Sequence, residues 1–252
     1  MSSNKNSLNI IYENDNFIAI NKPVGLLVHP TTEDRKEKEE TLIKYVLKQY
    51  PQIKKIGDNK NLRPGIVHRL DKNTTGIIVI AKTQKFFDYF KELLKKKKDI
   101  NKTYIALLWG KIEKEGTVNK PIGLKPGTTK QTVWTDNAKM IKNALTEYKP
   151  LKVFKKDEDF YTLAELTPKT GRTHQLRVHM ASLHHSIIGD GRYGKTGNPW
   201  SISHQLLHAY SLEFNLMDSN KRVKLITNLP EDFLAIFNDL GLTSQGINDI
   251  LK

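Results

Sequence analysis

The chain has 252 residues, 38% of them hydrophobic, which suits a globular protein with its own core and excludes a disordered chain. Its 41 Lys and Arg against 27 Asp and Glu give a formal net charge of +14, which favours a polyanionic partner such as RNA, DNA or an anionic membrane. The absence of cysteine excludes disulfides, thiolate catalysis and Cys-ligated zinc.

The chain shows no targeting or membrane signal. Met1–Asn9 is polar and lacks the apolar run of a signal peptide, and the first arginine is Arg35, which argues against a transit peptide. No stretch approaches the length of a membrane span. We therefore expect a cytoplasmic protein with no membrane partner.

The first fifty residues predict a hairpin and a helix. The apolar runs within Leu8–Asn21 flank a polar turn, which is typical of a β-hairpin. A charged loop follows over Thr31–Glu40. Thr41 is expected to cap a short helix that ends before Pro51.

The next segment predicts two strands and a second helix. The β-branched runs Ile66–Leu70 and Ile77–Ala81 indicate strands, with the polar loop Asp71–Gly76 between them. Thr83 is expected to cap a helix that ends in the cationic run Lys95–Lys98. The apolar residues of that helix recur at helical spacing, which indicates a core-facing stripe: Phe86, Phe87, Phe90, Leu93 and Leu94.

The remainder is rich in strands. Strands are predicted at Thr103–Trp109, Leu145–Phe154, Phe160–Leu166 and Leu206–Phe214. Helical spacing is seen over Thr173–Leu183, and Pro230–Leu240 and Ser244–Leu251 predict short closing helices. Because the strands do not alternate regularly with helices, the pattern predicts an α+β fold with a largely antiparallel sheet, in a single domain over residues 1–252.

Four segments are denser in polar, glycine and proline residues than their apolar flanks require: Asn21–Pro30, His68–Asp71, Lys102–Tyr104 and Thr170–His179. Asp71, at the end of a predicted strand, is placed to face a cleft, although such an aspartate is also typical of an Asx-turn. A neighbouring guanidinium would keep its carboxylate ionised. Arg69, on the same side of the predicted strand, and Arg177, on the later helix, are the candidates.

These motifs resemble the RluA family of pseudouridine synthases, in the order of that family. Further matches are Thr74–Gly76, Gly189–Asp190 with Tyr193–Gly194, and Leu207–Ala209. Two departures are visible: Thr75 stands where the family more often has serine, and His184-His185-Ser186 stands where it usually has Gly-His-Pro. We expect the chain to lack the S4-like RNA-binding domain that many members carry.

The resemblance implies the pseudouridine-synthase fold, a mixed, mainly antiparallel sheet with flanking helices and a central basic cleft. It also implies an isomerase that flips a uridine out of structured rRNA or tRNA and converts it to pseudouridine. The reaction exchanges an N1–C1′ bond for a C5–C1′ bond without redox change, so we expect no cofactor and no metal. RNA is the expected partner, DNA is not, and the protein is expected to be a monomer.

The resemblance also assigns roles to residues. Asp71 matches the catalytic aspartate, which acts either on the sugar C1′ or on a sugar proton. Tyr104 matches the active-site tyrosine, and Arg177 the arginine that pairs with the aspartate. Arg69 matches the arginine that enters the base stack. The RNA-binding residues expected from these motifs are Arg69, His68, Lys22, Arg172 and His174.

Alternatives remain open at this point. Outside the resemblance, Tyr104 reads as an ordinary core tyrosine of a strand. A non-catalytic RNA-binding protein on the same fold is one rival function. A metal-dependent nuclease is another, but it needs clustered carboxylates, and Asp71 has none nearby in sequence. The spacing of His174 and His179 fits a zinc site poorly.

Overall fold

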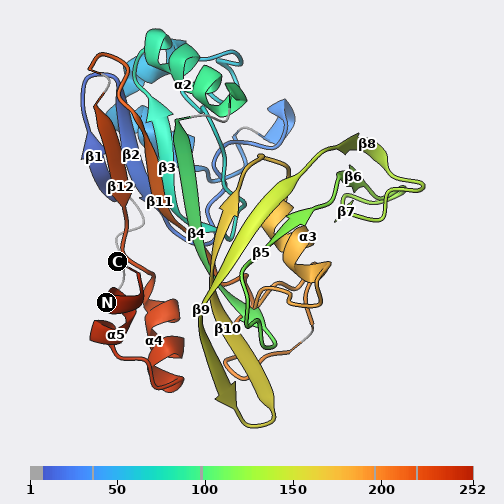
Figure 1. Ribbon diagram of the computed structural model, residues 1–252. Helices are drawn as coiled ribbons and strands as arrows, with labels where there is room; N and C mark the ends of the chain where they lie inside the picture. Colours follow the sequence, from blue (N-terminus) through green and yellow to red (C-terminus); the bar gives the residue numbers. More distant parts are fainter. Residues whose placement is uncertain (1–7, 36, 97–98, 196, 220, 252) are drawn as a thin grey trace. The chain divides into compact units, whose positions relative to one another are not determined.

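The structure is a computed structural model that describes residues 8–35, 37–96, 99–195, 197–219 and 221–251 (Figure 1). The expectations for residues 1–7, Lys36, Lys97 and Lys98 lie outside these ranges. The chain forms two compact units. The first comprises Met1–Asn101 and Ala209–Asn228, and the second comprises Lys102–His208 and Leu229–Lys252.

The first unit is built on an antiparallel sheet. Its strands follow the order β1-β2-β3-β11, and β12 pairs with β11. Their bounds are β1 Ile10–Glu13, β2 Phe17–Lys22, β3 Thr75–Ala81, β11 Leu207–Asn215 and β12 Arg222–Ile226. The pairing of β1 with β2 confirms the predicted hairpin.

The helices of this unit are α1 Leu42–Gln49 and α2 Gln84–Lys96, with 3-10 turns η1 Glu33–Arg35 and η2 Pro51–Lys55. The Thr83 hydroxyl accepts from the Phe86 amide at 3.2 Å, which confirms the predicted cap of α2. Thr41 is the N-cap residue of α1, as predicted, but its side chain makes no capping bond. The predicted stripe of α2 packs on the strands in one aromatic core: Phe17, Phe86, Phe90 and Phe214 lie at its centre.

The predicted strand Ile66–Leu70 is wrong. Only Ile66 forms an isolated bridge, to Ile80, and the residues after it are irregular. The reason is that the next β3 amide along this edge, that of Val79, donates to the His68 side chain at Nε2 and not to a backbone carbonyl, so the ladder does not continue past Ile66. His68–Asp71 is therefore part of an irregular loop that leads into β3, with Arg69 exposed and Leu70 buried.

The second unit has a four-stranded antiparallel sheet in the order β4-β10-β9-β5. The strands are β4 Ile100–Trp109, β5 Gly116–Asn119, β9 Leu145–Lys156 and β10 Asp159–Pro168. Helix α3 Gln175–Ala181 packs on β9 and β10, and α4 Glu231–Asp239 and α5 Ser244–Ile250 follow near the C-terminus. Asp239 fixes α4 by accepting from Lys156 and from Trp200 Nε1.

A small second sheet, absent from the sequence-based prediction, projects from this unit near α3 (Figure 1). Its order is β7-β6-β8, with β6 Ile122–Leu124, β7 Gln131–Thr132 and β8 Lys139–Lys142. We call residues 120–142 the lobe. Trp134 on the lobe is 78% exposed, and Met140 and Ile141 are also exposed.

Both units combine mainly antiparallel strands with flanking helices, which confirms the predicted α+β class. The single-domain expectation stays a prediction. Among the residues that the structure describes, none of the helices combines the length and apolar character needed to cross a membrane.

His184 occupies a backbone conformation that favours glycine. Its φ is +63°, in the left-handed region that side chains other than glycine rarely adopt. Replacing His184 with Gly is therefore expected to stabilise the fold by about 0.5–1 kcal/mol. Thermal unfolding measures the effect. Ala181→Gly, at a helical position of α3, is the control and should destabilise by a similar amount. A lowered melting temperature for His184→Gly would contradict this reading.

Candidate functional site

Asp71 lies on a loop that is held close to the sheet of the first unit. The carboxylate residue is half-buried and follows buried Leu70. Its carbonyl accepts from the Thr74 amide at 3.1 Å, which closes a turn. Gly76 ends the loop with φ +105°, and a Cβ there would lie 2.3 Å from the Ala209 carbonyl oxygen. This approach requires glycine and fixes the path of the loop.

Lys22 supports the same loop from inside the first unit. The side chain is fully buried, and its Nζ donates to the carbonyls of Pro23, Leu26 and Lys72 at 2.8–2.9 Å. Lys72 directly follows Asp71, so this bond ties the loop to the Asn21–Pro30 segment. The direct RNA contact predicted for Lys22 is therefore wrong, because a buried ammonium with three backbone acceptors does not reach RNA.

The charge of Lys22 depends on two opposed effects. Burial lowers the pKa of Lys22 to about 7, while the negative charge of Asp71 acts to raise it. The ammonium form carries three N–H donors, which matches the three carbonyls that surround it. Asp71 and Lys22 thus interact electrostatically inside the first unit, a contact that the sequence did not predict.

Replacing Lys22 with Met is expected to change how stability depends on pH. Between pH 7 and 10.5 the unfolded chain holds the Lys22 proton and the folded chain releases it, so parent stability rises with pH over this window. Lys22→Met should lack that rise, which amounts to at most roughly 5 kcal/mol. Urea unfolding at several pH values measures the difference. Parallel curves for the parent and the variant would refute a depressed lysine pKa.

Arg69 and His68 take different places in the first unit. Arg69 is exposed, as a residue that contacts RNA requires, but it lies on no strand. The argument that it shares a strand face with Asp71 is therefore wrong. His68 Nε2 accepts from the Val79 amide at 2.9 Å, and its ring stacks on Phe90. These contacts tie His68 to β3 and α2, and its predicted RNA contact stays a prediction.

Tyr104 lies on β4 in the second unit. It is half-buried and pairs across the sheet with Leu166 of β10. The strand continues into the fully buried run Ile105–Leu108, so the tyrosine sits where β4 emerges from the core. This placement leaves part of the side chain accessible to a ligand.

Arg177 forms a two-pronged pair with Asp190 in the second unit. Nε donates to Oδ2 at 2.7 Å and Nη2 to Oδ1 at 2.8 Å, with both side chains buried. Burial acts to raise the pKa of Asp190, but Arg177 and the amides of Arg192 and Tyr193 outweigh it and hold that pKa below its usual value. The two parallel bonds fix the plane of the guanidinium group against the Asp190 carboxylate.

Arg172 and His174 lie just before α3. Arg172 Nε donates to the Asn143 carbonyl at 2.9 Å. His174 adopts φ +55°, and its Nδ1 lies 2.8 Å from the Tyr193 hydroxyl. Both residues are half-buried, so part of each side chain remains available to RNA. Their RNA contacts stay predictions.

His179 has a structural environment. It is fully buried, with Nδ1 2.9 Å from the Thr146 hydroxyl and Nε2 3.0 Å from the Lys120 carbonyl. Burial lowers the pKa of His179, so the neutral ring predominates at neutral pH. Within the described ranges, no group of three or more His, Asp or Glu side chains is arranged to hold a metal ion.

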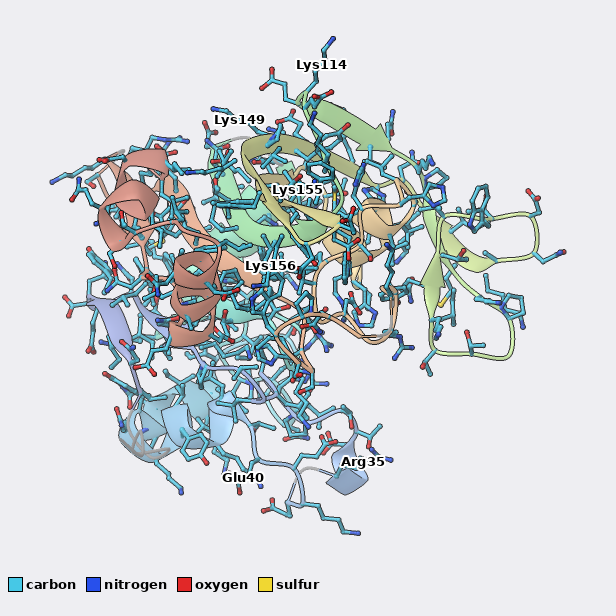
Figure 2. All side chains as sticks on the ribbon, turned by 90° about the horizontal axis from the view of Figure 1, so that it is seen from below. Arg35, Glu40, Lys114, Lys149, Lys155 and Lys156 are labelled. Atoms are coloured by element: carbon cyan, nitrogen blue, oxygen red, sulfur yellow. The ribbon has the colours of Figure 1, made fainter. Side chains whose placement is uncertain are left out.

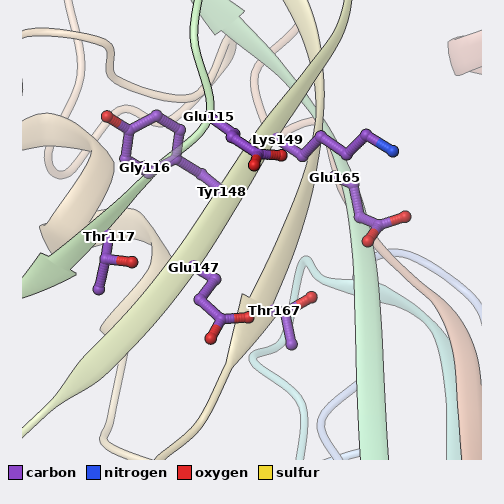
Figure 3. A pocket seen from close by; sticks show the side chains of 8 residues that line it. All are labelled: Glu115, Gly116, Thr117, Glu147, Tyr148, Lys149, Glu165 and Thr167. Carbon is purple, nitrogen blue, oxygen red and sulfur yellow. The ribbon is translucent and has the colours of Figure 1, made fainter.

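A pocket of about 380 Å³ lies on the sheet of the second unit, and none of the predicted site residues is among those that line it. Figure 3 shows Glu147 and Lys149 projecting from β9 and Glu165 from β10. Lys149 and Glu165 are directly opposed across the strands, as in many solvated sheet faces. With Glu115 the pocket carries three carboxylates and one ammonium, so its charge disfavours RNA phosphate.

Cationic side chains are distributed widely over the surface. Figure 2 shows Lys149, Lys155 and Lys156 on β9 and Lys114 on the loop before β5. Lys156 pairs with Asp239 at 2.9 Å, and Lys155 lies over the Phe160 ring. These lysines contribute to the solvent-exposed surface of the second unit. The high net charge by itself therefore does not identify one face as the RNA-binding face.

The predicted site residues fall into two groups. Lys22, His68, Arg69 and Asp71 belong to the first unit, and Tyr104, Arg172, His174 and Arg177 belong to the second. Sequence reasoning missed the role of Asp190 as partner of Arg177 and that of Tyr193 beside both. The motif Gly189-Asp190 with Tyr193-Gly194 drew attention to these positions, but it did not predict that either residue contacts Arg177.

Comparison with known proteins identifies the family. A family model described as RNA pseudouridylate synthase matches residues 16–182. The chain is 37% identical over 237 residues to the ribosomal large subunit pseudouridine synthase D of Nitrosomonas europaea, an alignment that covers 91% of this chain and 64% of that protein. It is 36% identical over 232 residues to the protein of the same name from Borreliella burgdorferi, covering 91% and 68%. The chain thus spans about two thirds of the length of these relatives.

Solved structures agree with this match. Human RNA pseudouridylate synthase domain containing 1 aligns with a TM-score of 0.71 and 26% identity, covering 95% of this chain and 90% of that one. Human RNA pseudouridylate synthase domain containing 4 shares the fold, with a TM-score of 0.69 and 23% identity over 92% and 93% of the two chains. The matched residues 16–182 include Asp71, Tyr104 and Arg177, and on this evidence the chain belongs to the RNA pseudouridylate synthase family.

Proposed function

We propose that this protein isomerises uridine to pseudouridine in ribosomal RNA, with Asp71, Tyr104 and Arg177 as its catalytic residues. The observation that carries the proposal is the family match over residues 16–182, which contains all three. The relatives at 34–37% identity named for the ribosomal large subunit favour ribosomal RNA over tRNA. Because residues 16–182 draw on both units, we further propose that these form one catalytic domain.

The reaction assigns distinct work to the three residues. Asp71 acts as an anion, either on C1′ or on a sugar proton, while the N1–C1′ bond breaks and the C5–C1′ bond forms. The C5 proton must then leave and N1 must gain one. Tyr104 offers an aromatic face on which the uracil can stack, and a phenol that can help to remove the C5 proton. Arg177, fixed by Asp190, supplies an immobile positive charge.

Flipping the target uridine out of its stack costs free energy, which contacts between the protein and the RNA must offset. Unstacking a base costs a few kcal/mol, and an arginine that fills the gap recovers part of it. Exposed Arg69 is suited to this role, and Arg172 and His174 are proposed as further RNA contacts. We expect a monomer that acts in the cytoplasm, without a cofactor and without DNA as a partner.

Mapping pseudouridine in RNA tests the proposal. Total RNA from cells that contain or lack this protein is mapped by a base-specific chemical modification and primer extension. We expect one or more uridines of large-subunit ribosomal RNA to be pseudouridine only when the protein is present. If the affected uridines lay only in tRNA, the substrate would be tRNA and not ribosomal RNA. If no uridine changed, the proposed activity would be refuted.

A further inference from the structure

Tyr193 stands between the lobe and Arg177 in the second unit. It lies in the small apolar cluster of Ile122, Ala144 and Val178, which joins the lobe to α3. Its hydroxyl is 3.0 Å from the Gln131 amide, which donates to it, and 2.8 Å from His174 Nδ1. The phenol oxygen therefore links β7 of the lobe to the residue that caps α3.

The ring and backbone of Tyr193 engage the Arg177–Asp190 pair. The guanidinium carbon of Arg177 lies 5.2 Å from the centre of the Tyr193 ring, a cation–π contact. The Tyr193 amide donates to Asp190 Oδ1 at 3.2 Å. Asp190 fixes the edge of the guanidinium and Tyr193 covers its face, so two contacts set the orientation of Arg177.

A second contact runs parallel to the first. Arg192 Nη2 donates to the Thr129 hydroxyl of the lobe at 2.6 Å, and the Arg192 amide donates to Asp190 Oδ1 at 3.0 Å. The lobe thus reaches the carboxylate of Asp190 through two neighbouring residues. A shift of β7 cannot leave Asp190 and Arg177 unaffected while these bonds hold.

The lobe itself has the chemistry of an RNA-contacting surface. Trp134 is 78% exposed, and Lys120 lies 5.9 Å from the centre of its ring. Its other cations are Lys125, Lys130, Lys139 and Lys142. An exposed aromatic among lysines suits stacking on bases together with phosphate contact.

We propose that Tyr193 is a positioning residue that transmits contact between the lobe and RNA to the orientation of Arg177. The inference rests on the proposed function for the role of Arg177 in turnover. Tyr193 itself need not touch the reacting uridine. Its phenol is one of two connections from the lobe, and removal of the hydroxyl breaks this one while the ring over Arg177 and the Arg192–Thr129 bond remain.

Kinetics of Tyr193→Phe test the positioning role. We expect kcat to fall roughly 10-fold, with KM changed less than about 2-fold. Trp134→Ala should lower both RNA affinity and kcat in the parent. When Tyr193 is Phe it should lower affinity as much but kcat less, so the kcat effects are not additive. Tyr161→Phe is the matched control, since the buried Tyr161 hydroxyl has no hydrogen-bond partner among the described residues. An unchanged kcat for Tyr193→Phe, or additive effects, would overturn the proposal.

A measurement without turnover separates this inference from the proposed function. Amide hydrogen exchange is followed with and without a large-subunit ribosomal RNA fragment. In the parent, RNA should slow exchange both in the lobe and in residues 189–193. In Tyr193→Phe the lobe should slow as much as in the parent, but residues 189–193 should slow less. Equal protection of residues 189–193 in both proteins would overturn the coupling. A parent that shows both protections but makes no pseudouridine would refute the proposed function and leave the coupling supported.

Discussion

Replacing Asp71 with Asn is expected to abolish pseudouridine formation, by at least about 10³-fold, while RNA affinity stays within about 2-fold of the parent. The amide keeps the size of the side chain but removes the anion that must act on the sugar. Release of tritium to water from RNA labelled at uridine C5 measures turnover, because C5 loses its hydrogen when the new glycosidic bond forms. Asp88→Asn, on the exposed face of α2, is the matched control and should leave turnover unchanged.

Lys22 provides a second control for the same experiment. Asp71 acts to raise the pKa of buried Lys22, so Asp71→Asn leaves that ammonium less stabilised and lowers the stability of the fold. The double variant Asp71→Asn, Lys22→Met should remove the buried charge but remain inactive. If the double variant recovered turnover, the loss in Asp71→Asn would be a folding defect, and Asp71 would not be the catalytic anion.

Replacing Arg177 with Met is expected to nearly eliminate turnover, and Arg177→Lys to impair it less. The lost guanidinium leaves the Asp190 carboxylate buried and without its two strongest donors, which costs about 3–5 kcal/mol of stability. Lysine restores a positive charge but not the planar geometry that bonds both carboxylate oxygens. Urea unfolding and turnover below the unfolding midpoint are measured for both variants.

Stability and catalysis are separated by changing Asp190 as well. Arg177→Met with Asp190→Asn removes both buried charges, and the Asn oxygen can still accept from the Arg192 and Tyr193 amides. This double variant should regain most of the stability lost in Arg177→Met but stay inactive. Parent-like turnover in the double variant would show that Arg177 serves only to neutralise Asp190. The pairing of Arg177 with Asp71 that the family resemblance implies stays a prediction.

The sequence predicted helices and strands well where apolar residues recur with a clear helical or strand spacing. The aromatic stripe of α2 and the long apolar strands β3, β4 and β10 were placed within a few residues of their observed bounds. Residues 66–70 misled because an apolar β-branched run indicates burial as readily as it indicates a strand. Only the folded structure shows that the His68 side chain takes the Val79 amide and so ends the pairing with β3 after Ile66.

The lobe and the charge network escaped prediction for a different reason. All four residues of β8 are exposed, so the strand has no apolar alternation to reveal it. Thirteen positions separate Arg177 from Asp190, across the end of α3 and a loop, and no local period connects them. Lys22 was assigned to RNA from its motif. Its burial depends on three backbone carbonyls that converge only in the folded chain.

The central claim is that this chain makes pseudouridine in ribosomal RNA with its own residues alone. The most direct measurement incubates purified, chelator-treated protein with unmodified large-subunit ribosomal RNA and maps pseudouridine at each position over time. We predict that pseudouridine accumulates at discrete uridines with the parent and at none with Asp71→Asn, without added metal or nucleotide. RNA that is bound and yet remains unmodified, or that is cleaved at those positions, would contradict the account.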